Sequence, residues 1–198
     1  EIAFHRGLWS FIFLLTIIII LGKISYFFEI FSSYKKIFIL SFTAILISIN
    51  WTGFIIAVNL NRVQDASMGY YLTPLISIGL GYFFLNEKIS SLKLLSVLIM
   101  SISIVYLIFT FKTIPFLALL IGTTWGIYGL LRKQINVSPE IGLLYESGFI
   151  TLIAAPYLIY LNYYDLGFFL NDSFRTSALL VLTGAVTTFP LFFFNLGV

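Results

Sequence analysis

Long apolar runs, separated by short polar breaks, make up almost the entire chain. A helix needs about 20 residues to cross the hydrocarbon core of a membrane, and seven runs approach that length. They lack the alternation over about 10 residues that marks the strands of a membrane barrel. The pattern therefore predicts an all-α integral membrane protein, a polytopic helix bundle with seven transmembrane helices. The runs span residues 7–22, 37–61, 66–86, 94–111, 113–131, 141–161 and 176–198. The helix of the first run is expected to start earlier and to carry His5 and Arg6 in its first turn.

Local signals mark the starts of two of these runs. Ser138-Pro139-Glu140 offers a capping hydroxyl, a proline at the first helical position and a carboxylate at the positive end of the helix dipole. Residues 113–115 form a similar start after a tight turn at Lys112. These signals support the division of the second half of the chain into separate helices.

The composition agrees with a membrane protein. Apolar residues make up 60% of the chain and charged residues 10%, with a mean hydropathy of +1.06, whereas soluble domains carry about 25% charge. The net charge of +3 comes from scattered residues, so nucleic acid is not expected as a partner. There is no cysteine, one histidine and no HExxH, GxSxG or P-loop motif. The sequence therefore predicts no enzyme, cofactor or metal site.

Basic residues are unequally shared between the two sets of loops. The segments 23–36, 87–93 and 132–140 hold seven Lys and Arg, and the opposite side holds four. The positive-inside rule places the richer loops in the cytoplasm. The chain then enters the membrane from outside, and one earlier helix is expected if the protein starts in the cytoplasm.

A faint internal repeat accompanies this topology. When the chain is displaced by 140 residues, Thr43 meets Thr183 and Phe54 meets Phe194, while Arg6 falls on Glu146. By the loop charges, the helices paired in this way cross in opposite directions. Inverted repeats around a central site are common in secondary transporters.

The run at 66–86 combines small residues with a proline. Gly69, Thr73, Ser77 and Gly81 recur every four residues, a stripe that favours close helix packing. Pro74 removes the usual hydrogen-bond partner of the carbonyl four residues earlier, that of Tyr70. That carbonyl either faces a polar pathway or is satisfied by a neighbouring helix.

Charges inside membrane spans usually face a cavity or a partner, because they cost about 2.5–3.5 kcal/mol to insert. Glu146 lies one to two turns into its run, near the predicted cytoplasmic side, and is a candidate functional carboxylate. Arg6 lies near the outer end of its run, where it either snorkels to headgroups or acts in a site. Because Glu146 is predicted near the cytoplasmic side and Arg6 near the outer side, a direct pair between them is not expected. His5 is a candidate proton relay or ligand.

Amides and aromatic side chains supply further candidates. Asn50 and Trp51 lie in the second run, where an amide normally bonds to another helix. Trp125 and Tyr128 lie among glycines in the fifth run, and suit either a pocket for a planar solute or an interfacial belt.

Several stretches resemble the RarD-type permeases of the EamA family, within the drug/metabolite transporter superfamily. They occur in the same order along essentially the whole chain. The stretches are EIAFHRGLWS (1–10), INWTGFIIAVN (49–59), ASMGYYLTPLISIGLGYFFLNEKI (66–89), IPFLALLIGTTWGIYGLLRK (114–133), IGLLYES (141–147) and GAVTTFPLFFF (184–194).

The resemblance implies ten helices in two inverted five-helix repeats. Residues 1–111 would belong to the first repeat without its first helix, and residues 112–198 would start the second repeat. The family's recurrent polar and special positions correspond here to His5, Arg6, Trp9, Asn50, Trp51, Asn59, Gly69, Tyr70, Pro74, Glu87, Tyr128 and Glu146. Tyr71 and Thr73 depart from the bulky apolar and amide residues of the family.

Together these features predict a secondary transporter that moves a small metabolite or drug-like solute across the bacterial inner membrane by alternating access. Asn50, Trp51, Tyr70, Pro74 and Tyr128 are the candidate substrate-binding residues. Arg6 and Glu146 are the candidate gating or coupling residues, with protons as the candidate coupling ion. The alternative is a non-transporting membrane scaffold or lipid-binding subunit. The substrate, the direction of transport and the oligomeric state stay open.

Overall fold

The computed structural model describes residues 1–111 and 116–197. The predicted turn at Lys112 and the predicted helix start at 113–115 lie outside these residues. The described chain is helical, with two short helical turns between the first two long helices. The elements are α1 (Ile2–Ile20), α2 (Ile24–Phe28), the 3-10 helix η1 (Glu29–Ser32), α3 (Tyr34–Asn59), α4 (Val63–Leu85), α5 (Ser91–Phe111), α6 (Phe116–Lys133), α7 (Pro139–Tyr163) and α8 (Phe174–Gly197).

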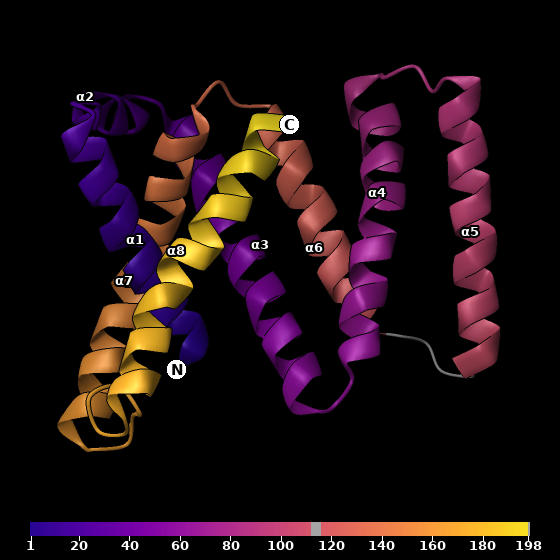
Figure 1. Ribbon diagram of the computed structural model, residues 1–198. Helices are drawn as coiled ribbons and strands as arrows, with labels where there is room; N and C mark the ends of the chain where they lie inside the picture. The colour runs from indigo at the N-terminus through magenta and orange to yellow at the C-terminus, as the bar shows by residue number, and fades with distance from the viewer. Residues whose placement is uncertain (112–115, 198) are drawn as a thin grey trace. The chain divides into compact units, whose positions relative to one another are not determined.

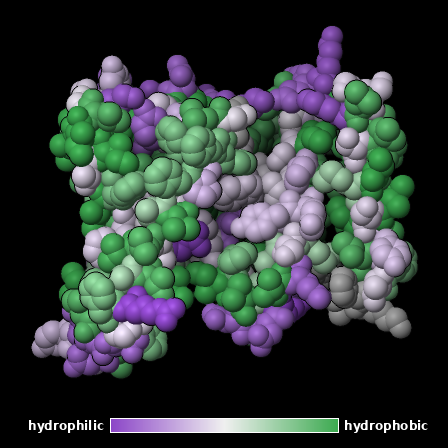
Figure 2. All heavy atoms as spheres, in the orientation of Figure 1, coloured by the Kyte–Doolittle hydropathy of each residue, from purple (hydrophilic) through white to green (hydrophobic). Residues whose placement is uncertain are grey.

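Each predicted span corresponds to one long helix, so the all-α class is confirmed. Among the described residues, α1, α3, α4, α7 and α8 are long and apolar enough to cross a membrane. The described apolar part of α5, Ser91–Leu107, is shorter, and α6 carries two basic residues in its last turn. On the face in Figure 2, hydrophobic side chains cover much of the helix flanks and hydrophilic ones gather near helix ends.

The chain divides into two compact units. Unit 1 comprises Glu1–Ile45 and Arg132–Val198, and unit 2 comprises Leu46–Leu131. These units group residues by contact, whereas the predicted boundary at 111/112 groups them by an internal repeat. The two divisions concern different properties, and the repeat stays a prediction.

Unit 1 is organised by α1, which packs against both α7 and α8 (Figure 1). Two glycines allow these helices to approach closely. A Cβ at Gly184 of α8 would come within 2.6 Å of the Trp9 side chain, and a Cβ at Gly7 of α1 would come within 2.5 Å of Ile150. Small residues serve this purpose in membrane helices, where the hydrophobic effect no longer drives association.

Unit 2 contains a comparable contact between α4 and α6. A Cβ at Gly69 would lie 2.8 Å from Ile121, and one at Gly122 would lie 2.9 Å from the carbonyl oxygen of Gly69. The predicted packing role is therefore confirmed for Gly69. The stripe does not continue as one interface, because Ser77 is exposed and Gly81 faces the carboxylate of Glu87.

Two local predictions need correction. Ser138 is the N-cap of α7 with Pro139 in the first turn, but its hydroxyl makes no capping hydrogen bond. Arg132 was counted among the cations of the loop 132–140, yet it is helical and only 6% exposed. The helix continues through Lys133 because the apolar run of α6 ends only one residue before Arg132, so the two cations extend its last turn.

Candidate functional site

A buried charge pair lies inside unit 1. Glu146 of α7 is 2% exposed, and its Oε1 accepts a hydrogen bond of 2.7 Å from the Thr43 hydroxyl of α3. The Nη1 of Arg132 lies 3.8 Å from the same oxygen. Arg132 Nε in turn donates to Oδ1 of Asn195, on α8, over 3.1 Å. Glu146, Arg132, Thr43 and Asn195 are called the charge network below.

The backbone of α7 is shaped to admit the arginine. Gly142 lies one helical turn before Glu146, and a Cβ at this position would overlap the Arg132 guanidinium. Residues at i and i+4 share a helix face, so the glycine opens space on the face that carries the carboxylate. A glycine in a helix interior costs up to about 1 kcal/mol relative to alanine. The Arg132 contact explains why α7 accepts that cost here.

Electrostatics explain why the network must be complete. Removing one partner of a buried ion pair costs about 3–5 kcal/mol, because it leaves a buried charge uncompensated. The Thr43 hydroxyl and the Asn195 amide supply hydrogen bonds to the two charges. A well-packed apolar replacement of the whole pair would often be neutral or stabilising. The presence of the pair is therefore weak evidence that it stabilises the fold. Ionisable residues within membrane spans typically mark a functional site.

The second predicted charge, Arg6, belongs to the interface between α1 and α8. Its Nε donates to the Thr187 hydroxyl over 3.0 Å, and Ser10 donates to the Gly184 carbonyl oxygen over 3.2 Å. Arg6 and Ser10, one turn apart on α1, are therefore both directed at α8. The contacts of Glu146 described above are with Thr43 and Arg132.

In unit 2 the amide of Asn50 bonds to a neighbouring helix. Its Nδ2 donates to the Ile121 carbonyl oxygen over 2.9 Å and to the Thr124 hydroxyl over 3.1 Å. Asn50 is 2% exposed. This is the helix-packing role that the sequence offers as the alternative to substrate binding, and it joins α3 to α6.

The other four candidates for substrate binding lie on three helices of unit 2. Trp51 and Tyr128 are buried, and Tyr128 stacks on Trp125 with ring centroids 5.5 Å apart. Tyr70 is 48% exposed, and Pro74, one turn further along α4, is also exposed. The Tyr70 ring lies 6.2 Å from that of Phe54 of α3. All five substrate candidates therefore lie in unit 2, whereas Arg6 and Glu146 lie in unit 1.

Sequence reasoning missed three members of the charge network: Arg132, Thr43 and Asn195. Arg132 stands beside Lys133 at the end of an apolar run, a position typical of a cytoplasmic cation. Gly142, one turn before Glu146, was an available signal, because a small residue beside an intramembrane acid leaves room for a long cationic partner. Nothing in the sequence identified that partner.

At each end of unit 1, a contact joins two segments that the loop charges predict to lie on the same side of the membrane. Lys23 Nζ lies 2.8 Å from Glu140 Oε1, and this carboxylate raises the pKa of Lys23. At the other end, the Glu1 carboxylate accepts hydrogen bonds from the backbone N–H groups of Phe168 and Phe169. Among the described residues, no group of three or more His, Asp and Glu side chains is arranged to hold a metal ion.

Comparisons with known proteins agree with the resemblance. The chain is 36% identical over 195 residues to an uncharacterised transporter of Vibrio cholerae and 34% identical over 195 residues to Protein RarD of Escherichia coli. It is 36% identical over 200 residues to the uncharacterised transporter YojE of Bacillus subtilis. The matches cover 98%, 98% and 100% of this chain, which spans 65%, 66% and 66% of these relatives. No family model and no solved structure matches.

Proposed function

We propose that this chain, a homologue of the RarD-type proteins, forms part of a secondary transporter in the bacterial inner membrane. It moves a small metabolite or drug-like solute by alternating access. The observation that carries the proposal is the charge network: a carboxylate and a guanidinium, both almost fully buried, within a bundle of apolar helices. The transporter names of several relatives support the same class of activity.

The charge network supplies an element that can exist in two arrangements. The Arg132–Glu146 separation of 3.8 Å is longer than a charge-assisted hydrogen bond, for which about 2.7–2.9 Å is usual. Each charge has a closer neutral partner, Thr43 for the carboxylate and Asn195 for the guanidinium. The direct pair can therefore tighten or open while each charge keeps one hydrogen bond. We infer that this change accompanies the switch between outward and inward access.

The proposal also includes the coupling of transport to protons through Glu146. A carboxylate that takes up a proton loses its attraction for Arg132, so protonation would favour the open arrangement of the pair. Arg6, at the α1–α8 interface, would act as a second gating charge. Of the substrate candidates, Trp51, Tyr70, Pro74 and Tyr128 would line the pocket in this account, while the Asn50 amide would hold α3 to α6 beside it.

Solute flux into proteoliposomes tests the proposal. The intact protein would be reconstituted and offered neutral, anionic and cationic metabolites together with drug-like amphipathic compounds. We expect flux of at least one class, and a loss of roughly tenfold or more in Glu146→Gln, the effect of about 1.4 kcal/mol on the rate-limiting barrier. Asp172→Asn, which changes an exposed loop carboxylate, is the matched control and should retain wild-type flux.

Thr43→Val keeps both charges and removes one hydrogen bond, so it reports on the network if Glu146→Gln does not fold. An unchanged rate and pH profile in Glu146→Gln would refute coupling through this residue. The absence of flux across the whole panel would instead favour the alternative of a membrane scaffold or lipid-binding subunit.

A further inference from the structure

A cavity with charged walls opens at the end of unit 1 that the loop charges predict to be cytoplasmic. Its volume is about 450 Å³, within the range of about 300–1,000 Å³ that is usual for small-molecule sites. It lies between the connection from α1 to α3 and the start of α7, and we call it the inner-end cavity. Charged and polar side chains among its walls are those of Lys23, Tyr26, Glu29, Lys36, Asn136 and Glu140.

Two of the four charged side chains in this lining pair with each other. Lys23 Nζ lies 2.8 Å from Glu140 Oε1. Within the part of the chain that the structure describes, Lys36 and Glu29 form no ion pair. The cavity therefore offers one cation and one anion to a ligand. These charges complement a zwitterion, because a purely anionic ligand would be repelled by Glu29 and a purely cationic one by Lys36.

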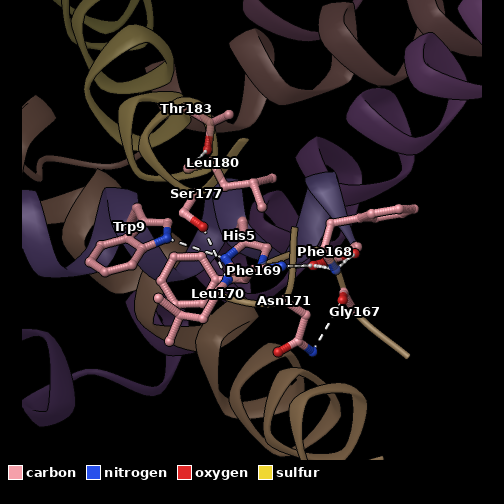
Figure 3. Close-up of polar contacts among 11 residues, drawn as sticks. His5, Trp9, Gly167, Phe168, Phe169, Leu170, Asn171, Ser177, Leu180 and Thr183 are labelled. Atoms are coloured by element: carbon pink, nitrogen blue, oxygen red, sulfur yellow. Dashed lines mark hydrogen bonds and ion pairs between the residues drawn. The ribbon is translucent and has the colours of Figure 1, made fainter. Parts of the chain in front are cut away.

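The opposite end of unit 1 differs, because its acid is engaged within the chain. Oε1 of Glu1 lies 3.4 Å from Nε2 of His5, and the Glu1 oxygens accept from the Phe168 N–H over 2.9 and 3.0 Å. In the same region the Ser177 hydroxyl accepts from the Leu170 N–H over 3.0 Å (Figure 3). The role of His5 as a proton relay or ligand stays a prediction. Glu29, by contrast, is an acid beside a cavity without a cationic partner from the described chain.

An exposed aromatic face adjoins the inner-end cavity. Residues 24–32, which form α2 and η1, are called the α2–η1 segment, and α2 runs across the end of α1 (Figure 1). Phe28 and Phe31 are 64% and 53% exposed. They lie three residues apart, so they share one face of a helical segment. Both rings pack against that of Phe27, with centroids 5.6 Å apart in each pair.

The position of the α2–η1 segment identifies what covers this face. The segment connects α1 to α3, both long and apolar enough to cross a membrane, so it lies at the membrane surface. Ser25, Glu29 and Ser32 form its polar face, at the spacing of four and three residues that a helix requires. An amphipathic segment at that depth turns its apolar face into the boundary between headgroups and acyl chains. The occupant of the Phe28 and Phe31 face is therefore lipid.

We propose that the inner-end cavity binds a phosphatidylethanolamine, a zwitterionic phospholipid with a primary ammonium group, from the cytoplasmic leaflet. Its phosphate lies against Lys36, its ammonium against Glu29 and its acyl chains against Phe28 and Phe31. A primary ammonium has three N–H donors for the Glu29 carboxylate, whereas the trimethylammonium of phosphatidylcholine has none. The site shares no residue with the charge network, and its occupation does not depend on whether the protein transports a solute.

Native mass spectrometry of the intact protein in a non-ionic detergent would measure the affinity for each lipid. Phosphatidylethanolamine, phosphatidylcholine and phosphatidylglycerol with identical palmitoyl and oleoyl chains would be compared. Phosphatidylglycerol brings no cation to Glu29, and phosphatidylcholine brings no N–H donor. Because charge pairs near the surface contribute modestly, we expect phosphatidylethanolamine to bind roughly two- to fivefold more tightly than either of the others.

Variants assign the preference to particular side chains. Lys36→Gln should weaken the binding of all three lipids by roughly two- to fivefold, because each carries a phosphate. Lys35→Gln is the matched control and should bind as the wild type does, since Lys35 is exposed and is not part of the cavity lining. Glu29→Gln should remove the preference over phosphatidylglycerol. The double variant Phe28→Ser with Phe31→Ser should weaken all three lipids by roughly threefold or more.

Equal affinity of the wild type for the three lipids would overturn the headgroup assignment, and this comparison needs no variant to fold. Equal losses in Lys36→Gln and Lys35→Gln would show diffuse attraction to a basic surface rather than binding in a cavity. Water-soluble glycerophosphoethanolamine distinguishes a free headgroup from a lipid. If it displaced phosphatidylethanolamine at an equal concentration, the aromatic face would contribute nothing. Each of these results contradicts the proposed site.

Discussion

Replacing Gly142 by alanine would place a methyl group where the Arg132 guanidinium lies. The obstacle is the end of a flexible side chain, so the chain can relieve the overlap in two ways. Small shifts that keep the guanidinium buried cost about 1–3 kcal/mol, as overpacking usually does. Expulsion of the guanidinium would leave Glu146 uncompensated at about 3–5 kcal/mol. The small shifts that keep the guanidinium buried cost less free energy than its expulsion. We therefore expect Gly142→Ala to lower the free energy of unfolding by about 1–3 kcal/mol.

The assay is equilibrium unfolding in mixed detergent micelles, followed by helical circular dichroism. The same substitution would be made in an Arg132→Met background, where the obstacle is absent. There Gly142→Ala should cost nothing or stabilise by up to about 1 kcal/mol, since alanine is the better helix former. Arg132→Met with Glu146→Gln is a second, uncharged background if Arg132→Met alone does not fold. An equal cost of Gly142→Ala with and without Arg132 would refute the contact.

Three further predictions concern packing and surface charge. Asn50→Leu removes the amide bonds between α3 and α6 and should destabilise by about 0.5–2 kcal/mol in the same assay. Gly69→Ala should cost about 1–3 kcal/mol because its Cβ would enter the neighbouring helix, whereas Gly79→Ala, with nothing within 4 Å, should be neutral or slightly stabilising. The Lys23–Glu140 pair raises the pKa of Lys23 above its ordinary value of 10.5. The stabilisation of the fold by this pair is therefore fully present below pH 10.5 and is lost as the pH rises through the raised pKa. Lys23→Met should remove this loss of stability at alkaline pH.

Each of these has an outcome that contradicts it. If Asn50→Leu equals wild type in stability, the amide makes no net bond across the interface. Equal effects at Gly69 and Gly79 would mean that helix propensity alone is measured. An alkaline transition that Lys23→Met leaves unchanged belongs to another group.

Helix positions could be predicted from the sequence because hydropathy and length determine them directly. The interior of each predicted span is helical, and differences arise at the ends. The first helix is predicted to start before Gly7 with His5 and Arg6 in its first turn, and α1 does start earlier, at Ile2. The second span is predicted to start at residue 37, whereas α3 starts at Tyr34. Charged and aromatic residues in a first turn lower the local hydropathy, yet they remain helical where the chain can satisfy their polar groups.

Partners across helices could not be predicted in the same way. A helix pattern gives the face on which Glu146 lies, but not which distant residue faces it. Arg132 lies 14 positions away in sequence and on another helix, and its neighbour Lys133 made it look like a loop cation. The same limit applies to Asn50, whose main partner is a backbone carbonyl of Ile121, a group that every residue has and that no motif can reveal.

The most direct test of alternating access is the accessibility of a cysteine placed at Thr43, next to Glu146. The native chain contains no cysteine, so a Thr43→Cys variant gives an unambiguous signal with a membrane-impermeant thiol reagent. Because Thr43 is fully buried in the structure, the account predicts slow labelling in the absence of solute and faster labelling, from one side of the membrane, when the best solute of the flux panel is added. A cysteine that stays unlabelled from both sides, with and without that solute, would contradict the account.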